Sequence, residues 1–415
     1  MSDANSFMDS SETRSGVERE ADLIQRFRKQ VQHAQTSSDY FKEHLKHINP
    51  DSIVDRSSLC QIPVTRKTDL KAIQAKAPPF GGLTTSPVSS LARVFSSPGP
   101  IYDPQATNED FWRFKRALYS VGARCGSLVY NTFSYHFTPA GFMADYGARA
   151  LGCAVFPAGI GQTELQAQTI AEIRPDIYTG TPSFLKILLE KGSELGLDLS
   201  SLKRGIVGGE ALLPSARKFF QDNNIEICQT YATADVGLIA YETLPDQGLI
   251  IDEDVLVEIV RPGSDDAVDE GEVGEVVVTV FSDIYPLIRF GTGDLSMFIP
   301  GQSPCGRTNR RLKGWMGRAD QTTKVKGMFV HPEQINAVVK RHPEIQYARL
   351  NVDHDEKHND VMTLECEISA DNGELMTAIV STLRDVTKLR GEVVYVPTNS
   401  LARDGKVIDD RRKYD

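Results

Sequence analysis

Three charged segments of the chain carry residue types that suit the binding of a nucleotide and a second anion. Residues 317–327 read Gly-Arg-Ala-Asp-Gln-Thr-Thr-Lys-Val-Lys-Gly, Asp294 ends the upstream run 289–294, Arg-Phe-Gly-Thr-Gly-Asp, and Lys406 follows Gly405 near the end of the sequence. A carboxylate such as Asp294 can accept hydrogen bonds from both hydroxyls of a ribose. The guanidinium of Arg318 is a forked donor to phosphate, and the ammonium of Lys406 can bridge two anions.

Each of these residues also has an ordinary structural interpretation. An aspartate after a Thr-Gly pair is often a turn or cap residue. An exposed ion pair of Arg318 would contribute at most about 1 kcal/mol, and a lysine near a chain end is commonly a solvated charge. It is the order of the three segments that favours the functional interpretation.

In that order, the segments resemble the adenylate-forming superfamily of acyl-CoA synthetases, adenylation domains and luciferases. The runs 59–70 and 78–83 are similar to the N-terminal part of phenylacetate-CoA ligases, so the likeness is nearest to that family and covers the chain from about residue 20. The resemblance implies an acid-CoA ligase that consumes ATP with Mg²⁺, forms an acyl-adenylate and pyrophosphate, and then transfers the acyl group to CoA. The acid expected is aromatic, or small and either hydroxylated or branched.

The resemblance also assigns roles to the charged residues. Asp294 would bind the ribose, Arg318 the ribose and α-phosphate, and Lys406 would be the catalytic lysine of adenylation. Asp320 stands at the hinge about which the C-terminal domain rotates, and a hinge needs only a few residues that absorb the change in backbone angles. The residues expected to contact CoA are Lys324, Lys326 and Gly327.

Two further segments are expected to contact the nucleotide. The glycines of Gly208-Gly209-Glu210 would let the backbone approach the adenine closely. The run 231–235, Tyr-Ala-Thr-Ala-Asp, resembles the Tyr-Gly-x-Thr-Glu element of the family, with Tyr231 stacked on the base or, alternatively, half-buried in the core. Asp235 is the expected Mg²⁺ ligand, because hard cations prefer oxygen. The expected nucleotide contacts here are Gly208, Gly209, Glu210, Tyr231, Ala232 and Thr233.

The phosphate loop departs most from the family. Relatives carry a Ser/Thr/Gly-rich run that ends in Gly-Lys-Pro and wraps phosphates with backbone N–H groups. Residues 95–104 of this chain read Phe-Ser-Ser-Pro-Gly-Pro-Ile-Tyr-Asp-Pro, in which three prolines remove donors and the lysine is missing. The expected contacts that remain are Ser96, Ser97 and Gly99.

An aromatic run is the expected acid pocket. Residues 131–141 read Asn-Thr-Phe-Ser-Tyr-His-Phe-Thr-Pro-Ala-Gly, and the family likeness places this region at the acyl pocket and the thiol-access tunnel. His136 is expected to be either a catalytic residue or a packing residue among aromatics. The segment 180–183, Gly-Thr-Pro-Ser, predicts a strand exit and a helix N-cap that also reaches the pocket. The expected pocket residues are Tyr135, His136, Phe137, Ala140, Gly141, Gly180, Thr181 and Pro182.

The composition of the chain limits its expected cellular location and its expected binding partners. The chain has 415 residues and a formal net charge of -10, which argues against a general affinity for nucleic acid. Its six cysteines include no Cys-x-x-Cys pair, a pattern that favours reduced thiols in the cytoplasm. Neither a signal peptide nor a membrane-spanning apolar window is recognisable. We expect a cytoplasmic homodimer with no nucleic-acid or membrane partner.

The expected fold class is α/β. Short apolar runs alternate with helical patterns between residues 127 and 207, which predicts βαβ units and a mainly parallel sheet. Ligands bind at the carboxyl ends of such strands. Period-two runs at 255–260 and 274–280 predict an antiparallel β subdomain over about 243–300. The length favours two domains, namely a large one over 17–319, after a disordered tail over 1–16, and a small, mobile α+β domain over 320–415.

Single elements are expected outside this core as well. Apolar residues at helical spacing predict one amphipathic helix between Val17 and Leu45, and Thr65 is a candidate N-cap for the charged run that follows it. In the C-terminal part, helices are expected at 332–341 and 374–386, and strands at 347–352, 362–368 and 393–396.

Two other functions remain compatible with these residues. The prolines of the phosphate loop fit a nucleotide- or acyl-CoA-binding homologue that has no ligase activity. The same adenylation chemistry also serves enzymes that load a carrier protein instead of CoA, although no fused carrier domain is recognisable in this sequence.

Overall fold

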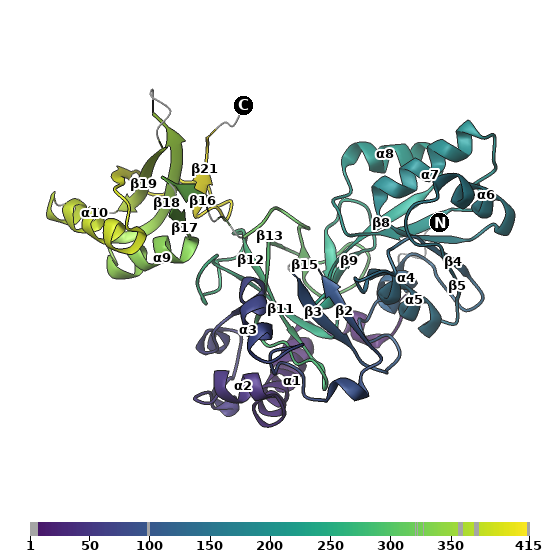
Figure 1. Cartoon of the computed structure of the whole chain (residues 1–415), viewed down its shortest axis with the longest axis horizontal. Coiled ribbons are helices and arrows are strands. Elements are labelled where there is room, and N and C mark those ends of the chain that lie inside the picture. The colour runs from purple at the N-terminus through teal and green to yellow at the C-terminus, as the bar shows by residue number, and fades with distance from the viewer. Residues whose placement is uncertain are drawn as a thin grey trace. The chain divides into compact units, whose positions relative to one another are not determined.

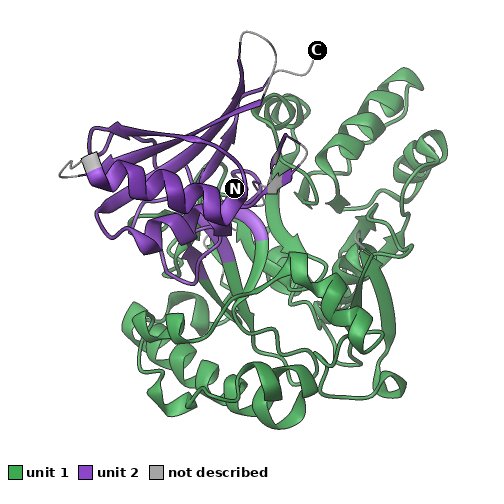
Figure 2. Ribbon diagram, turned by 60° about the vertical axis from the view of Figure 1, so that its left-hand side comes forward, with its two compact units in different colours: residues 1–257, 277–292, 298–315 green, residues 258–276, 293–297, 316–415 purple. Residues whose placement is uncertain are grey.

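The computed structural model describes residues 7–97, 100–319, 321, 323–326, 328–355, 360–368 and 373–412. The chain divides into two compact units, which Figure 2 colours separately. Unit 1 comprises residues 1–257, 277–292 and 298–315, and unit 2 comprises residues 258–276, 293–297 and 316–415. The functional boundary expected at residue 320 stays a prediction. Among the described residues, every helix is too short or too polar to cross a membrane.

Unit 1 is built on a nine-stranded sheet of order β14-β15-β10-β9-β8-β7-β6-β4-β5. The pairs from β5 through β8 are all parallel, whereas β8, β9, β10, β15 and β14 pair antiparallel in succession. This is the mixed α/β class expected from the alternation in the sequence. The strands are β4 (Leu128–Asn131), β5 (Ala154–Pro157), β6 (Ile177–Gly180), β7 (Arg204–Val207), β8 (Glu226–Thr233), β9 (Gly237–Glu242), β10 (Leu249–Ile251), β14 (Phe298–Ile299) and β15 (Arg311–Leu312).

Helices cover both faces of the parallel strands. Val129 and Tyr130 are consecutive on β4, so their side chains point to opposite faces. Val129 packs in a cluster with residues of α4 and α5, such as Met143, and Tyr130 packs with residues of α6, α7 and α8, such as Leu185. Figure 1 shows α6, α7 and α8 side by side. The helices are α4 (Lys115–Ser120), α5 (Ala140–Ala150), α6 (Thr163–Ile173), α7 (Pro182–Glu194) and α8 (Pro214–Asp222).

The N-terminal part of unit 1 corrects two expectations. The helix expected between Val17 and Leu45 is broken at Ser38, whose hydroxyl accepts the N–H of Phe41 and so starts a second helix. Thr65 is no helix cap, because it pairs with Phe290 in a short parallel strand. The elements here are α1 (Gly16–Ser37), α2 (Asp39–His44), β1 (Thr65–Arg66), α3 (Leu70–Lys76) and the 3-10 turns η2 (Ser10–Thr13), η3 (Pro50–Ser52), η4 (Ser57–Gln61), η5 (Lys67–Asp69) and η6 (Val88–Ser90).

Two smaller sheets complete the strands that precede residue 300. Strands β2 (Arg93–Ser97) and β3 (Ile101–Gln105) form an antiparallel hairpin. A four-stranded sheet has the order β1-β13-β12-β11, with β11 at Val255–Val260, β12 at Gly274–Val280 and β13 at Phe290–Ser296. The period-two runs at 255–260 and 274–280 therefore predicted the bounds of β11 and β12 correctly.

The C-terminal part of unit 2 is an α+β body with its own core. Its main sheet has the order β20-β19-β18-β21, and the core side chains come from this sheet, α9 and α10. The expected helices and strands are present, but the sequence did not predict the hairpin of β16 and β17 or the last strand, β21. The elements are β16 (Thr323–Val325), β17 (Met328–Val330), α9 (Pro332–Arg341), β18 (Ile345–His354), β19 (Asp360–Ile368), α10 (Gly373–Thr387), β20 (Glu392–Val396) and β21 (Ile408–Asp410).

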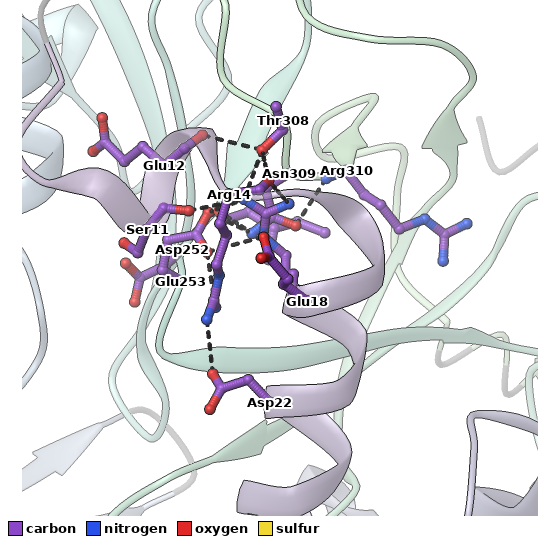
Figure 3. Close-up of polar contacts among 12 residues, drawn as sticks. Ser11, Glu12, Arg14, Glu18, Asp22, Asp252, Glu253, Thr308, Asn309 and Arg310 are labelled. Atoms are coloured by element: carbon purple, nitrogen blue, oxygen red, sulfur yellow. Dashed lines mark hydrogen bonds and ion pairs between the residues drawn. The ribbon is translucent and has the colours of Figure 1, made fainter.

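Buried ion pairs fasten the N-terminal segment to unit 1, in contrast to the disorder expected over residues 1–16. Glu12 is 1% exposed and lies 2.9 Å from Arg116 and 3.0 Å from Arg307. Figure 3 shows the neighbouring cluster around Arg14 and Glu253. The carboxylate of Glu253 accepts two hydrogen bonds from Arg19, at 2.9 and 3.1 Å. Charges buried in this way are held in place because an unpaired charge is costly in the interior. Residues 7–16 are ordered for this reason, and residues 1–6 lie outside the described range.

We predict that Glu253→Gln lowers the free energy of unfolding by about 3–5 kcal/mol, because it leaves the buried guanidinium of Arg19 without its counter-charge. Urea denaturation of the full chain measures the change. Asp198→Asn is the control, since Asp198 pairs with Arg174 at 2.9 Å on the surface, with both side chains more than half exposed; it should change stability little. Equal effects of the two substitutions would contradict the structural role of the Glu253 cluster.

Candidate functional site

The carboxyl ends of β4, β6, β7 and β8 bring four of the predicted segments together. These strands are parallel neighbours, so the loops that follow them meet at one edge of the sheet. Backbone hydrogen bonds join the loops directly: Gly208 donates to Gly180 at 3.1 Å, and Thr132 donates to Thr179 at 2.8 Å. The edge is therefore a continuous surface of main chain.

Two glycines allow this close approach, and a third exposes the backbone. A Cβ atom on Gly180 would lie 1.9 Å from the hydroxyl oxygen of Thr132, and one on Gly208 would lie 2.5 Å from that of Thr230. Gly209 has a φ of +79°, a conformation that glycine adopts without strain, and a Cβ atom there would only reach van der Waals contact with Phe133 and Thr181, both at 3.8 Å. Because Gly209 is also exposed, a flat ligand can lie against the main chain at this point.

The segment 180–183 starts α7 as predicted. The hydroxyl of Thr181 accepts the N–H of Phe184 at 3.3 Å, and Pro182 occupies the first turn. Glu210, which was expected near the nucleotide, accepts the N–H of Ser183 at 2.7 Å. Thr181, Pro182 and Glu210 thus organise the N-terminus of a helix at the site edge, and any contact that they make with a ligand stays a prediction.

A small cavity of about 100 Å³ opens at the same edge. Five residues expected at the pocket or the nucleotide line it, namely Ala140, Gly208, Gly209, Ala232 and Thr233. The remaining walls are largely apolar. Phe133, Thr138 and Pro139 belong to the run 131–141 expected at the acid pocket, and Ala234 belongs to the run 231–235. The other lining residues, Phe114, Met143 and Thr230, were not predicted.

Asn131 holds the aromatic run 131–141 in shape. Its buried side-chain amide donates to the hydroxyl of Tyr135 and to the carbonyl of Gly141, both at 2.8 Å. Tyr135 also donates to Asp145 at 3.1 Å, and its pKa is raised, chiefly by burial. His136 and Phe137 are exposed, the latter to 80%. A catalytic role of His136 stays a prediction.

The β2–β3 hairpin contains the residues 95–104 that were expected to form the phosphate loop. Its strands pair as far as Ser97 and Ile101, and Ser96 donates its N–H to the carbonyl of Phe137 at 2.8 Å. The hydroxyl of Ser97 donates to Asp103 at 2.9 Å, so that it is already engaged. Gly99 lies outside the described residues.

A buried charge cluster lies behind this hairpin. The ammonium of Lys67 is 2.6 Å from one carboxylate oxygen of Asp235, whose side chain is fully buried. Burial and the nearby charge of Asp235 raise the pKa of Asp103 well above its usual range. Tyr285 is also buried beside the two carboxyls, and burial raises the pKa of its hydroxyl. Lys67 is therefore the cation of a buried cluster that includes the carboxyls of Asp103 and Asp235.

Asp235 can serve as one ligand of a magnesium ion. Its second oxygen, Oδ1, is buried and accepts no hydrogen bond within the described residues, whereas the first is paired with Lys67. The described residues contain no cluster of three or more potential metal ligands. One protein carboxylate would be sufficient for an ion carried on nucleotide phosphates, because Mg²⁺ usually takes one or two carboxylates in addition to substrate oxygens.

Tyr231 and its neighbours lie on the last residues of β8. The hydroxyl of Tyr231 donates to the hydroxyl of Thr292 on β13 at 3.1 Å, and its ring is half-buried. The hydroxyl of Thr233 accepts the N–H of Val236 at 3.2 Å, which shapes the turn towards β9. The structure thus shows the half-buried tyrosine that was one of the two expectations, with the hydroxyl anchored.

In unit 2, the structure pairs the two charged segments with which the sequence analysis began. Arg318 donates to the carboxylate of Asp294 at 2.8 Å, and the main chain of Gly293 accepts the N–H of Ala319 at 2.8 Å. Glycine suits position 293, because its φ is +75°, a conformation that other residues rarely adopt. The carboxylate and the forked donor that were assigned to one ribose therefore lie side by side.

Lys406 sits on the loop that leads into β21. Its ammonium is 2.9 Å from Asp409 and is about half exposed. Among the residues expected to bind CoA, Lys326 is exposed and donates its N–H to Asp360 at 2.6 Å. Lys324 lies on β16, whereas Gly327 and the hinge residue Asp320 lie outside the described residues.

Lys67 was not expected at the site, and Asp103 and Asn131 were named only as members of the runs 95–104 and 131–141. Asn131 is the last residue of β4, a position that could have singled it out, because polar residues at the carboxyl ends of parallel strands often line a site. Lys67 and Asp103 offered no such signal, since 168 positions separate Lys67 from Asp235 and only tertiary packing brings them together.

We predict that Gly180→Ala lowers the free energy of unfolding by about 1–3 kcal/mol, the usual cost of overpacking. The new methyl group would collide with the hydroxyl of Thr132, which forms a 2.7 Å hydrogen bond with the hydroxyl of Tyr178. Chemical denaturation measures the loss, and Gly16→Ala, where no atom lies within 4 Å, is the control. Combining Gly180→Ala with Thr132→Ala should recover part of it. An additive double variant would argue against this contact.

Comparisons with known proteins relate the chain to a family. The family model described as AMP-binding enzyme matches residues 112–280. The phenylacetate-coenzyme A ligase of Aromatoleum evansii is 30% identical over 365 residues, which cover 83% of this chain and 81% of the relative. The phenylacetate-coenzyme A ligase of Thermus thermophilus is 31% identical over 313 residues, covering 72% of this chain and 69% of the relative.

A solved structure shows the same fold. The open conformation of 2-hydroxyisobutyryl-CoA ligase, in complex with 2-HIB-AMP and CoA, has a TM-score of 0.71 and 23% identity, and covers 94% of this chain and 91% of that chain. At this level of identity the likeness speaks for the fold. It confirms the expected mixed α/β class.

Proposed function

The chain belongs to the phenylacetate-coenzyme A ligase family of adenylate-forming enzymes, and on this premise we propose how its residues divide the reaction between them. The protein is an ATP-dependent acid-CoA ligase that acts through an acyl-adenylate. The observation that carries the assignment of its site is the convergence of the loops after β4, β6, β7 and β8 at one sheet edge, which lies within the residues matched by the AMP-binding model.

In the first half-reaction, an oxygen of the carboxylate attacks the α-phosphorus of ATP, and the bond to the β-phosphate breaks with release of pyrophosphate. Two anions must meet, so the site has to neutralise charge and align the attacking oxygen. Lys406 is the proposed catalytic cation for this step. Mg²⁺ carried on the phosphates, with Asp235 as its protein ligand, would neutralise the remaining charge.

The nucleotide is proposed to lie along the carboxyl edge of the sheet. Gly208, Gly209 and Glu210, together with Tyr231, would contact the adenine, since the exposed glycine backbone accepts a flat ring. Ser96, Ser97 and Gly99 would contact the phosphates. The remaining proposed contacts are Ala232 and Thr233 at the base, Asp294 at the ribose and Arg318 at the ribose and α-phosphate.

Cations at this site are already paired with carboxylates. Arg318 is bound to Asp294, and Lys67 to Asp235. Such pairs keep each cation in a fixed place before the nucleotide arrives, and preorganised charge of this kind is the main source of electrostatic catalysis.

The acid is proposed to occupy the cavity lined by Phe114, Phe133 and Met143. Its limited size and apolar walls support an acid with an aromatic or a small branched or hydroxylated side chain. His136 is proposed as a catalytic residue at its rim, and the other proposed pocket residues are Tyr135, Phe137, Ala140, Gly141, Gly180, Thr181 and Pro182.

In the second half-reaction, the thiolate of CoA attacks the acyl carbon, and AMP leaves with the former carboxylate oxygen. We propose that rotation about Asp320 removes Lys406 from the adenylate before this step, and that Lys324, Lys326 and Gly327 contact CoA. Free CoA is proposed as the acceptor in preference to a carrier protein.

The setting of the enzyme is also a proposal. The six cysteines are all free thiols in the structure, which supports the reducing cytoplasm as its location. We further propose a homodimer that binds neither nucleic acid nor membranes. Sedimentation of the purified chain tests the dimer.

Acid-dependent pyrophosphate release tests the function. We expect release with at least one member of a panel that includes phenylacetate, benzoate, 2-hydroxyisobutyrate and isobutyrate, in the presence of ATP and Mg²⁺, and thioester formation when CoA is added. A chain that binds ATP but releases no pyrophosphate with any acid would instead be the inactive homologue that the proline-containing hairpin favours. Adenylation without transfer to free CoA would favour a carrier protein as acceptor.

Lys406→Ala is expected to slow adenylation by about 100- to 1,000-fold, the usual cost of losing one preorganised charge contact. It should still form thioester from supplied acyl-adenylate, because Lys406 acts only in the first step. The fold should survive, since Asp409 keeps a second partner in Arg411 at 3.0 Å. Lys340→Ala, an exposed lysine on α9, is the control. Equal loss of both half-reactions would remove Lys406 from this role.

A further inference from the structure

The side chain of Gln321, next to the expected hinge residue, forms three hydrogen bonds with the loop that carries Lys406. The amide nitrogen of Gln321 donates to the carbonyl of Gly405 at 2.7 Å. Its amide oxygen accepts the N–H groups of Val407 and Ile408 at 2.5 and 2.9 Å. The three bonds reach main-chain groups on both sides of the lysine, and all these residues belong to unit 2.

The loop needs such a support because of its own sequence. Gly405 has a φ of +76°. Glycine can adopt many other backbone conformations as well, so other contacts must hold it in this one. Among the described residues, the main chain of Lys406 binds side chains, since its N–H donates to Asp404 at 3.1 Å and its carbonyl accepts from Arg349 at 3.2 Å. Pairing with β18 begins at the next residue, where the carbonyl of Val407 accepts the N–H of Leu350 at 2.9 Å.

Gln321 is suited to this task by its chemistry. A primary amide offers donors and an acceptor on one rigid plane, so a single side chain can bind a carbonyl on one side of Lys406 and N–H groups on the other. The contacts span 84 to 87 positions of the sequence. They connect the residue that directly follows Asp320 to the loop of the lysine.

We propose that Gln321 is a positioning residue. Its hydrogen bonds connect the hinge segment to the loop of Lys406, so that the lysine moves together with the hinge segment when the C-terminal domain rotates. The inference rests on the role proposed above for Lys406 in adenylation. Gln321 touches neither substrate, and acts by restricting where the ammonium can be. Loss of the restraint should therefore weaken adenylation and spare the second half-reaction, in which the lysine takes no part.

A purely structural role would give a different result. If Gln321 only stabilised the α+β body, its removal would lower thermal stability and affect both half-reactions alike. Gln334 provides the matched control, because it also binds main chain twice in unit 2: its oxygen accepts the N–H of His331 at 2.9 Å, and its nitrogen donates to Val386 at 2.6 Å.

The experiment compares Gln321→Ala, Gln321→Glu and Gln334→Ala in the full chain, with pyrophosphate release and thioester formation from supplied acyl-adenylate measured separately. Gln321→Ala should reduce kcat of adenylation by about 10- to 100-fold, as small misplacements of catalytic groups do, with little change in KM or in thioester formation. Gln321→Glu keeps the acceptor for the two N–H groups but loses the donor to Gly405, so its adenylation rate should be intermediate. Gln334→Ala should lower the melting temperature while the ratio of the two half-reactions stays that of the wild type.

Two outcomes would overturn the inference. One is wild-type adenylation by both Gln321 variants in a protein whose Lys406→Ala variant is inactive, and the other is equal loss of both half-reactions. Failure of the proposed function has a separate signature, since the wild type itself would then release no pyrophosphate with any acid. Should Gln321→Ala fail to fold, Gln321→Glu, which retains two of the three bonds, decides between these outcomes.

Discussion

The parallel pairing of β4, β6, β7 and β8 is the constraint on which the rest of the site depends. Parallel strands send their carboxyl ends to the same edge, so loops that are far apart in the sequence must meet there. The pairing is close enough that Gly180 and Gly208 have no room for a side chain. Main-chain atoms of neighbouring loops therefore lie in contact at this edge, where Gly209 is exposed and an apolar cavity of about 100 Å³ opens. Helices on both faces of the sheet keep the strands, and therefore the loops, in register.

The cations that we propose for the reaction are each paired with a carboxylate of their own unit. Each cation that we assign near phosphate is held by a carboxylate: Arg318 by Asp294, Lys67 by Asp235, and Lys406 by Asp409. A bound nucleotide must share or replace these partners, which reduces the gain in binding free energy. The ion pairs also hold the cations in position before the nucleotide binds, so that no large rearrangement of charge is needed at the moment of reaction. Binding energy from the base and the acid would then be used to bring the anions together.

The β2–β3 hairpin offers few backbone donors to phosphate, so we infer that these cations would make a larger share of the contacts with the phosphates. Its strands pair as far as Ser97 and Ile101, its three prolines lack N–H groups, and the hydroxyl of Ser97 is bound to Asp103. Few main-chain donors are left for a triphosphate. Lys67 lies in η5, the short helical turn before α3, and its ammonium pairs with the buried carboxylate of Asp235 behind the hairpin. Lys67 would thus bring positive charge to the phosphates from another part of the chain.

The sequence by itself determined the elements with strong periodicity and the family. The strands at 255–260 and 274–280 and the helix at 332–341 could be predicted to the residue, because alternation and helical spacing are local properties. The order of Asp294, Arg318 and Lys406 was sufficient to identify the family, and the first two indeed form a pair. Only the tertiary structure decided that Lys67, Asp103 and Asp235 share one buried cluster, and that Gln321 holds the loop of Lys406. These contacts join residues separated by dozens of positions or more, and no local pattern encodes them, since they exist only once sheets and loops have packed.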